Sequence, residues 1–357
     1  VSFLLGEMLL RQLPIPGLTY FIGKYDDTVG MLFYPHSKMV YTGPGGQRVE
    51  REINSWGFPD VDHQREKPAG VYRIGFFGDS YTEARQVSVD STFFKVAERD
   101  LQGVGVECLA FGITSTGTLH SYLLSDAYAE VFDLDLIVYV FVENDPGDNI
   151  KEIKLDPGLP YASLADSGLV IDRSFRQAMA QKTTWYYSVA DYIVAHSLLA
   201  STVAHRIKLL LRHGVKMGTT AEDMDMATSM VAGAINPSQN DLPSSWPGAA
   251  QDNAAAVAEA LLLQWRREIE EDVREFAVMY VPRGSEWHKP TLDQDSWKAW
   301  LERICRVEGI AFIDPTAEFF AAEGKALYAD HFTTDGHRAF ASAFTRWYRS
   351  SRVEASR

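Results

Sequence analysis

The segment from Leu134 to Val142 constrains the fold more than any other part of the sequence. It reads LDLIVYVFV, is rich in β-branched residues and, apart from Asp135, is apolar throughout. A strand that is apolar on both faces is typical of parallel sheets, which helices cover on both sides. Two further apolar runs of strand length, 71–77 and 104–111, precede it, with helices expected near 93–101 and 119–130. This alternation predicts right-handed βαβ units.

The same alternation returns in the C-terminal part of the chain. We expect helices at 253–276 and 297–307, strands at 277–283 and 309–314, and a closing helix at 336–349. Residues 151–250 depart from the pattern and predict a mainly helical insertion over the sheet, serving either as a lid or as a partner surface. Residues 1–70 are turn-rich and predict an N-terminal extension to a core at 71–350.

Composition excludes several classes of function. The chain has 357 residues, is 46% hydrophobic and carries a formal net charge of −14, so it can bury a core but lacks the basic balance that nucleic acid binding needs. Its two cysteines make no disulfide framework, and Cys108 is expected in the core. No apolar stretch reaches the roughly 18 residues that span a bilayer.

The apolar start of the chain, residues 1–13, has two interpretations. It forms either a packed helix or the end of a membrane anchor or signal segment. The second interpretation predicts membrane association through the N-terminus and a periplasmic or membrane-anchored extracytoplasmic location. The first leaves a cytoplasmic location as the alternative.

Residues suited to nucleophilic catalysis follow the predicted strands. Ser80, in Gly78-Asp79-Ser80, stands at the end of the first strand, where open α/β sheets bind their ligands. A serine needs a base to become a nucleophile. Taken alone, the tripeptide is equally typical of a helix cap. Because Thr82 replaces the second glycine of G-x-S-x-G, the nucleophile elbow of α/β-hydrolases is not supported.

Two later motifs could supply the remaining parts of such a site. Asn144 directly follows the third strand and could donate its amide to an oxyanion, or could close an Asx turn. His331 lies just before the closing helix and could act as general base, with Asp330 beside it as the acid. His337 begins the closing helix and is expected to be structural.

Together, the order strand–GDS, glycine-bearing strand end, strand–Asn-Asp and late His-x4-Gly-His resembles the SGNH hydrolase family, also called GDSL esterases. The resemblance covers residues 71–150 and 252–350. It implies a flavodoxin-like three-layer sandwich with a parallel central sheet. It also implies that Ser80 is the nucleophile, that His331 is the base, and that an oxyanion hole is formed by the amides of Ser80 and Ser115 with the Asn144 side chain.

Two short elements resemble a bacterial subgroup of that family. These are Asn-x-x-Gly-Phe, from Asn54 to Phe58, and Asn-Asp-x-x-Asp-Asn, from Asn144 to Asn149. The subgroup often carries an N-terminal membrane anchor and is associated with cell-surface polysaccharides.

The sequence departs from the family pattern at three positions. Ser115 replaces the oxyanion glycine, and its amide can serve only if the turn has no positive φ. Val142 replaces a second glycine. The family's acid falls two or three residues before the histidine, whereas here only Asp330, one residue before His331, is near. Adjacent residues on an extended segment point to opposite sides. Either an irregular backbone brings Asp330 to the imidazole, or a Ser80–His331 dyad uses a backbone carbonyl instead.

The motifs predict a serine-dependent esterase, and the resemblance implies that it removes a small acyl group from a carbohydrate. One alternative is an O-acyltransferase acting on a surface polysaccharide, and another is a non-catalytic scaffold in a surface or membrane assembly. The sequence contains no metal-ligand motif and no phosphate loop, so we expect neither a metal nor a cofactor. Glu286 and His288 follow the fourth strand and either line the pocket or lie in a surface loop.

Overall fold

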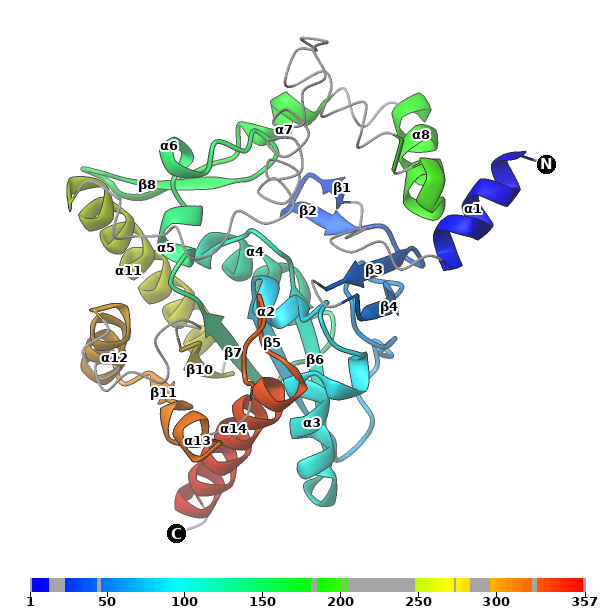
Figure 1. Cartoon of the computed structure of the whole chain (residues 1–357). Helices are drawn as coiled ribbons and strands as arrows, with labels where there is room; N and C mark the ends of the chain where they lie inside the picture. Colours follow the sequence, from blue (N-terminus) through cyan, green and yellow to red (C-terminus); the bar gives the residue numbers. More distant parts are fainter. Residues whose placement is uncertain are drawn as a thin grey trace.

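A parallel sheet forms the centre of the molecule. The computed structural model describes residues 2–12, 23–43, 46–180, 185–200, 202–203, 248–272, 274–282, 296–322 and 326–355. The five strands are β5 (Tyr72–Gly78), β6 (Val106–Gly112), β7 (Leu136–Phe141), β10 (Glu275–Tyr280) and β11 (Ala311–Ile313). They are arranged in the order β11-β10-β7-β5-β6 (Figure 1). Counted along the chain, this order is 2-1-3-4-5, the flavodoxin-like arrangement of doubly wound folds. The predicted α/β fold with a parallel central sheet is therefore confirmed.

Helices cover the sheet on both faces. One layer contains α3 (Phe93–Asp100), α13 (Thr316–Ala321) and α14 (Thr334–Ala355), and α3 and α14 pack against each other (Figure 1). The other layer contains α4 (Thr118–Tyr128), α11 (Gly248–Glu271) and α12 (Ser296–Glu308). Strand β7 lies between the layers. Its Val138 and Val140 pack with the α3–α14 layer, and Ile137 and Tyr139 with the other. This two-sided burial explains why the strand is apolar on both faces.

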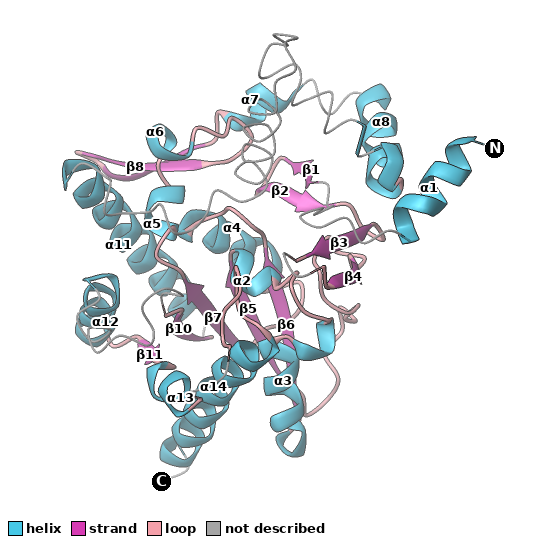
Figure 2. Ribbon diagram, in the orientation of Figure 1, coloured by secondary structure: helices cyan, strands magenta, loops and turns pink. Residues whose placement is uncertain are grey.

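The N-terminal region adds two antiparallel hairpins and a helix. The helix is α1 (Ser2–Gln12), and the strands are β1 (Gly23–Asp26), β2 (Gly30–Phe33), β3 (Lys38–Thr42) and β4 (Arg48–Glu52) (Figure 2). The Oδ1 atom of Asn54 accepts the backbone N–H groups of Trp56 and Phe58, both at 3.0 Å, which closes the turn after β4. Phe58 and Met39 are fully buried in the same cluster as α4 and α11. The hairpins therefore share the hydrophobic core of the sheet.

The segment between β7 and β10 contains both helices and strands. Its described helices include α6 (Lys151–Lys154), α7 (Phe175–Met179) and α8 (Trp185–His196). The antiparallel strands β8 (Tyr161–Ala165) and β9 (Gly168–Asp172) form a hairpin that the sequence analysis, which expected helices, does not predict. Gly168, directly after the turn of this hairpin, has a φ of 108°, a backbone conformation that glycine adopts more readily than other residues. The expected basic helix at 205–212 and loop at 236–247 lie outside the described residues.

The helix predicted at 253–276 is wrong at both ends. Helix α11 begins at Gly248 and ends at Glu271, and Phe276 belongs to β10. Pairing in the sheet explains the earlier C-terminal end, because β10 already aligns with β7 at Glu275 and Leu136. Among the described helices, none has the length and apolar character needed to cross a membrane.

Candidate active site

A tight turn carries Ser80 at the end of β5. The strand ends at Gly78, and the short helix α2 (Ser80–Glu83) starts two residues later. A Cβ atom on Gly78 would lie 2.4 Å from Thr82 Oγ1 and 3.0 Å from the Val140 carbonyl oxygen, so only glycine lets α2 fold back over the strand. Asp79 caps α2 by accepting the N–H of Tyr81 at 3.0 Å. Close packing thus explains the glycine of Gly-Asp-Ser, and helix capping explains the aspartate.

Helix α2 is also held against the end of β6. A Cβ atom on Gly112 would lie 2.1 Å from the backbone nitrogen of Glu83, so strand and helix meet backbone to backbone. The side chain of Glu83 accepts the N–H of Thr114 at 2.7 Å, which ties the loop after β6 to the helix. These contacts place Ser80 at the carboxyl edge of the sheet and leave it 3% exposed.

His331 reaches Ser80 from the C-terminal part of the chain. Its Nε2 atom lies 2.8 Å from Ser80 Oγ, and the histidine is also 3% exposed. The ring of Tyr81 packs on the imidazole with centroids 4.7 Å apart. The structure therefore brings together the two residues predicted as nucleophile and base, at a distance suited to proton transfer.

Asp330 approaches the other side of the imidazole through an irregular backbone. The N–H of Ala329 donates to the carbonyl oxygen of His331 at 2.8 Å, which makes a tight bend. Asp330 Oδ2 then lies 3.7 Å from His331 Nδ1, an ion-pair distance that is too long for a hydrogen bond. Of the two alternatives left by the sequence, the geometry favours a carboxylate beside the imidazole over a backbone carbonyl. Among the described residues, Nδ1 has no hydrogen-bond partner.

The second oxygen of Asp330 is fixed separately. Oδ1 accepts the backbone N–H of His331 at 3.0 Å and the hydroxyl of Tyr41 at 2.9 Å. Burial alone would raise the pKa of Asp330, but the contacts with His331 and Tyr41 hold that pKa well below its usual range. The carboxylate is therefore charged whenever an imidazolium forms beside it.

Asn144 lies close to Ser80, but its amide is already engaged. It precedes the short helix α5 (Asp145–Asp148), and its Nδ2 donates to Asp148 Oδ2 at 2.9 Å and to Asp79 Oδ2 at 3.4 Å. The same Asp79 oxygen lies 3.3 Å from Ser80 Oγ. An oxyanion could replace the long, weak contact to Asp79. Asn144 and the predicted nucleophile Ser80 are thus linked through one carboxylate oxygen.

The turn at Ser115 does not meet the condition under which its amide was expected to bind an oxyanion. That role assumed a turn without positive φ, whereas the φ of Ser115 is 62°, in the left-handed region. The side chain is exposed. The neighbouring Thr114 is tied to Glu83, and Thr116 Oγ1 donates to the Ile113 carbonyl oxygen at 2.6 Å, so both flanks of the turn are fixed. A left-handed backbone costs a side-chain-bearing residue about 1 kcal/mol. In the described chain, no hydrogen bond joins Ser115 to Ser80 or Asn144.

Several buried carboxyl groups at this edge were not assigned a role from the sequence. Asp79, Glu83 and Asp145 are each at most 1% exposed, and burial raises the pKa of all three. Asp79 stands inside the motif, but only the structure shows its contact with Ser80. Tyr41 has no signal in the sequence, because 289 residues separate it from Asp330.

His337 has the structural role expected for it. It is buried, its Nδ1 accepts the N–H of Phe93 at 3.2 Å, and burial lowers its pKa to about 3. It therefore fixes the start of α3 as a neutral ring.

Within the described ranges no group of three or more His, Cys, Asp and Glu residues could hold a metal ion. Glu286 and His288 lie outside these ranges.

Comparison with known proteins finds no matching family and no matching curated protein. Among solved structures, a member of the lipolytic protein G-D-S-L family from Veillonella parvula is 11% identical, with a TM-score of 0.40 over 77% of this chain and 97% of its own. A mutant acetylxylan esterase from Geobacillus stearothermophilus is 13% identical, with a TM-score of 0.39 over 80% and 96%. The acetyl xylan esterase AlAXEase is 12% identical, with a TM-score of 0.39 over 76% and 97%.

Proposed function

We propose that this chain is a serine-dependent ester hydrolase of the SGNH type, with Ser80 as nucleophile and His331 as general base. The observation that carries the proposal is the 2.8 Å contact between Ser80 Oγ and His331 Nε2. It joins residues 251 positions apart and lies at the carboxyl edge of a doubly wound sheet, where such folds bind ligands.

In the proposed mechanism, His331 Nε2 takes the hydroxyl proton as Ser80 Oγ attacks the ester carbonyl. Asp330 stabilises the imidazolium that forms, since its Oδ2 faces Nδ1. The oxyanion is bound by the N–H of Ser80 and by Asn144, whose amide exchanges Asp79 for the substrate oxygen. His331 then returns the proton to the leaving alcohol, and a water molecule activated by the same imidazole hydrolyses the acyl-enzyme.

The substrate we propose is a small acyl ester carried on a carbohydrate. The sequence resemblance favours a carbohydrate carrier. The near-complete burial of Ser80 and His331, each 3% exposed, favours a short acyl group over a long chain. Hydrolysis rates of p-nitrophenyl acetate and p-nitrophenyl octanoate compare the two acyl lengths directly, and faster turnover of the octanoate would contradict the proposal.

The test of the nucleophile is labelling with a fluorophosphonate, which reacts with activated serines. We expect the wild type to be labelled and S80A and H331A to remain unlabelled. The matched control is S121A, which removes another buried serine, on α4, and should label like the wild type. Equal labelling of wild type and S80A would overturn the proposed function.

A further inference from the structure

The β3–β4 hairpin approaches the proposed active site from outside the sheet. Two of its buried side chains contact residues next to the catalytic pair. Tyr41, on β3, donates its hydroxyl to Asp330 Oδ1 at 2.9 Å. Arg51, on β4, donates from Nη1 to the carbonyl oxygens of Glu83 and Ala84, at 2.9 and 2.8 Å, at the C-terminal end of α2. The hairpin therefore contacts both the acid loop and the nucleophile helix.

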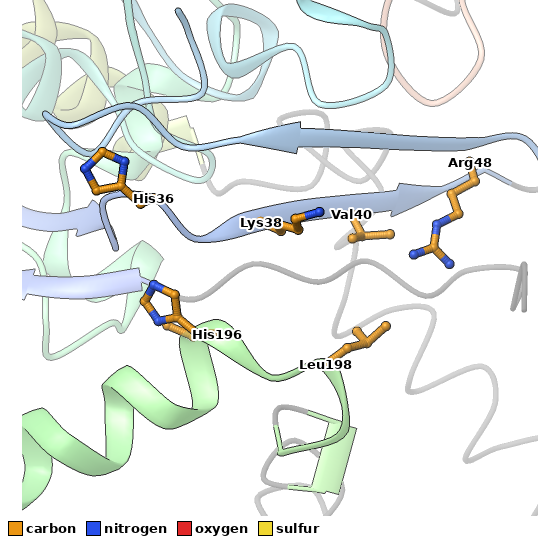
Figure 3. A pocket seen from close by; sticks show the side chains of 7 residues that line it. His36, Lys38, Val40, Arg48, His196 and Leu198 are labelled. Carbon is orange, nitrogen blue, oxygen red and sulfur yellow. The ribbon is translucent and has the colours of Figure 1, made fainter. Parts of the chain in front are cut away.

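The side chains of β3 alternate between two environments. Lys38 and Val40 face a cavity of about 120 Å³ between the hairpin and α8, into which His196 also points (Figure 3). Tyr41, one residue further on, faces the opposite way, as strand geometry requires. The tyrosine is only 4% exposed, so its ring is packed and its hydroxyl has a fixed direction.

A fixed partner matters for Asp330 because its Oδ2 lies beyond hydrogen-bond distance of the imidazole. The carboxylate has two oxygens, and only Oδ2 faces His331 Nδ1, at 3.7 Å. Oδ1 is held by the N–H of His331 and by the hydroxyl of Tyr41. The tyrosine hydroxyl and the backbone N–H of His331 therefore both hold this oxygen and oppose rotation of the carboxylate.

We propose that Tyr41 is a positioning residue for the esterase reaction: it fixes the Asp330 carboxylate so that Oδ2 faces the imidazole. The inference rests on the proposed function, since it concerns the activation of Ser80 by His331. Tyr41 acts through Asp330 and does not itself contact Ser80 or His331 in any hydrogen bond of the described chain. The N-terminal hairpin would then be part of the catalytic apparatus.

The experiment compares Y41F with Y122F. Tyr122 is a matched control, because it is 7% exposed and donates its hydroxyl to another carboxylate, Glu268, at 2.7 Å, on α11. The readout is the second-order rate constant for fluorophosphonate labelling of Ser80, with thermal stability measured for both variants. We expect Y41F to label roughly tenfold more slowly than the wild type, the effect of one hydrogen bond to a charged group, and Y122F to label within twofold.

The D330N background separates positioning from general stabilisation. If Tyr41 acts through Asp330, adding Y41F to D330N should slow labelling by less than twofold, whatever Y41F does to stability. The inference would be overturned if Ser80 in Y41F is labelled at the wild-type rate. It would also be overturned if adding Y41F to D330N slows labelling tenfold; in both cases labelling would still depend on Ser80. Failure of the proposed function gives a different result, namely equal labelling of wild type and S80A.

Discussion

Replacing Asp330 by asparagine tests whether the acid contributes at its observed distance. The substitution keeps the shape of the side chain and removes its charge. At 3.7 Å, an imidazolium and a carboxylate attract each other by about 4.5 kcal/mol with an effective dielectric constant of about 20. A general base gains its positive charge only when it takes the proton, so this attraction acts mainly in the transition state.

The expected loss is smaller than this attraction. Asp330 also interacts with Tyr41, and its side chain is 19% exposed, so water screens part of the charge. We therefore expect kcat/KM to fall roughly 30- to 150-fold, which corresponds to a loss of about 2 to 3 kcal/mol of transition-state stabilisation. The assay is hydrolysis of p-nitrophenyl acetate above neutral pH. The matched control is D335N, which removes an exposed carboxylate in the first turn of α14 that pairs with Arg338, and which should keep full activity.

Two results would refute the reasoning. If D330N keeps more than a third of the wild-type kcat/KM, the carboxylate at 3.7 Å does not support the base, and Ser80 and His331 act as a dyad. If D330N lowers the residual activity of an H331A chain as much as it lowers that of the wild type, the aspartate acts independently of the imidazole.

Three further predictions concern the elements that hold the site. G112A should lower the free energy of unfolding by about 3 kcal/mol or more, because its Cβ would meet the backbone of Glu83. The control is G103A, whose Cβ would meet nothing within 4 Å, and its chemical denaturation should match that of the wild type. S115G should label at the wild-type rate and unfold with a free energy equal to the wild type or up to about 1 kcal/mol higher, since glycine accepts a positive φ; a large loss of labelling would show that the serine side chain matters. The pKa of Asp79 is raised by burial, so the folded protein holds this proton more tightly than the unfolded chain; its contribution to stability is full below the unfolded pKa and is lost as pH rises through the folded value. D79N should therefore gain thermal stability over the wild type as pH rises, and a constant difference across the pH range would contradict this.

The sequence predicts the sheet from strong local signals, and it predicts the Ser80–His331 pair from an order of motifs that resembles the SGNH family. A strand that is apolar on both faces, such as β7, fits only a covered parallel sheet. Residues that follow such strands meet at one edge, which brings Ser80 and Asn144 together.

The details that the sequence misses depend on contacts between distant segments. The direction of the Asn144 amide is decided by Asp79 and Asp148, and the φ of Ser115 by how the turn after β6 is held. The contact of Tyr41 with Asp330 joins a hairpin to a loop across nearly the whole chain. No local pattern encodes such pairings.

These long separations also determine when activity can appear during synthesis. The proposed catalytic residues Ser80 and His331 are 251 positions apart, and Tyr41 and Asp330 are 289 positions apart. A ribosome makes the nucleophile turn early, but the base emerges only after the whole sheet and its intervening segment. Contacts between residues this far apart form slowly, because a long loop must close first. Reactive serine should therefore be absent from nascent chains and should appear last in refolding, so covalent labelling would time the completion of the fold.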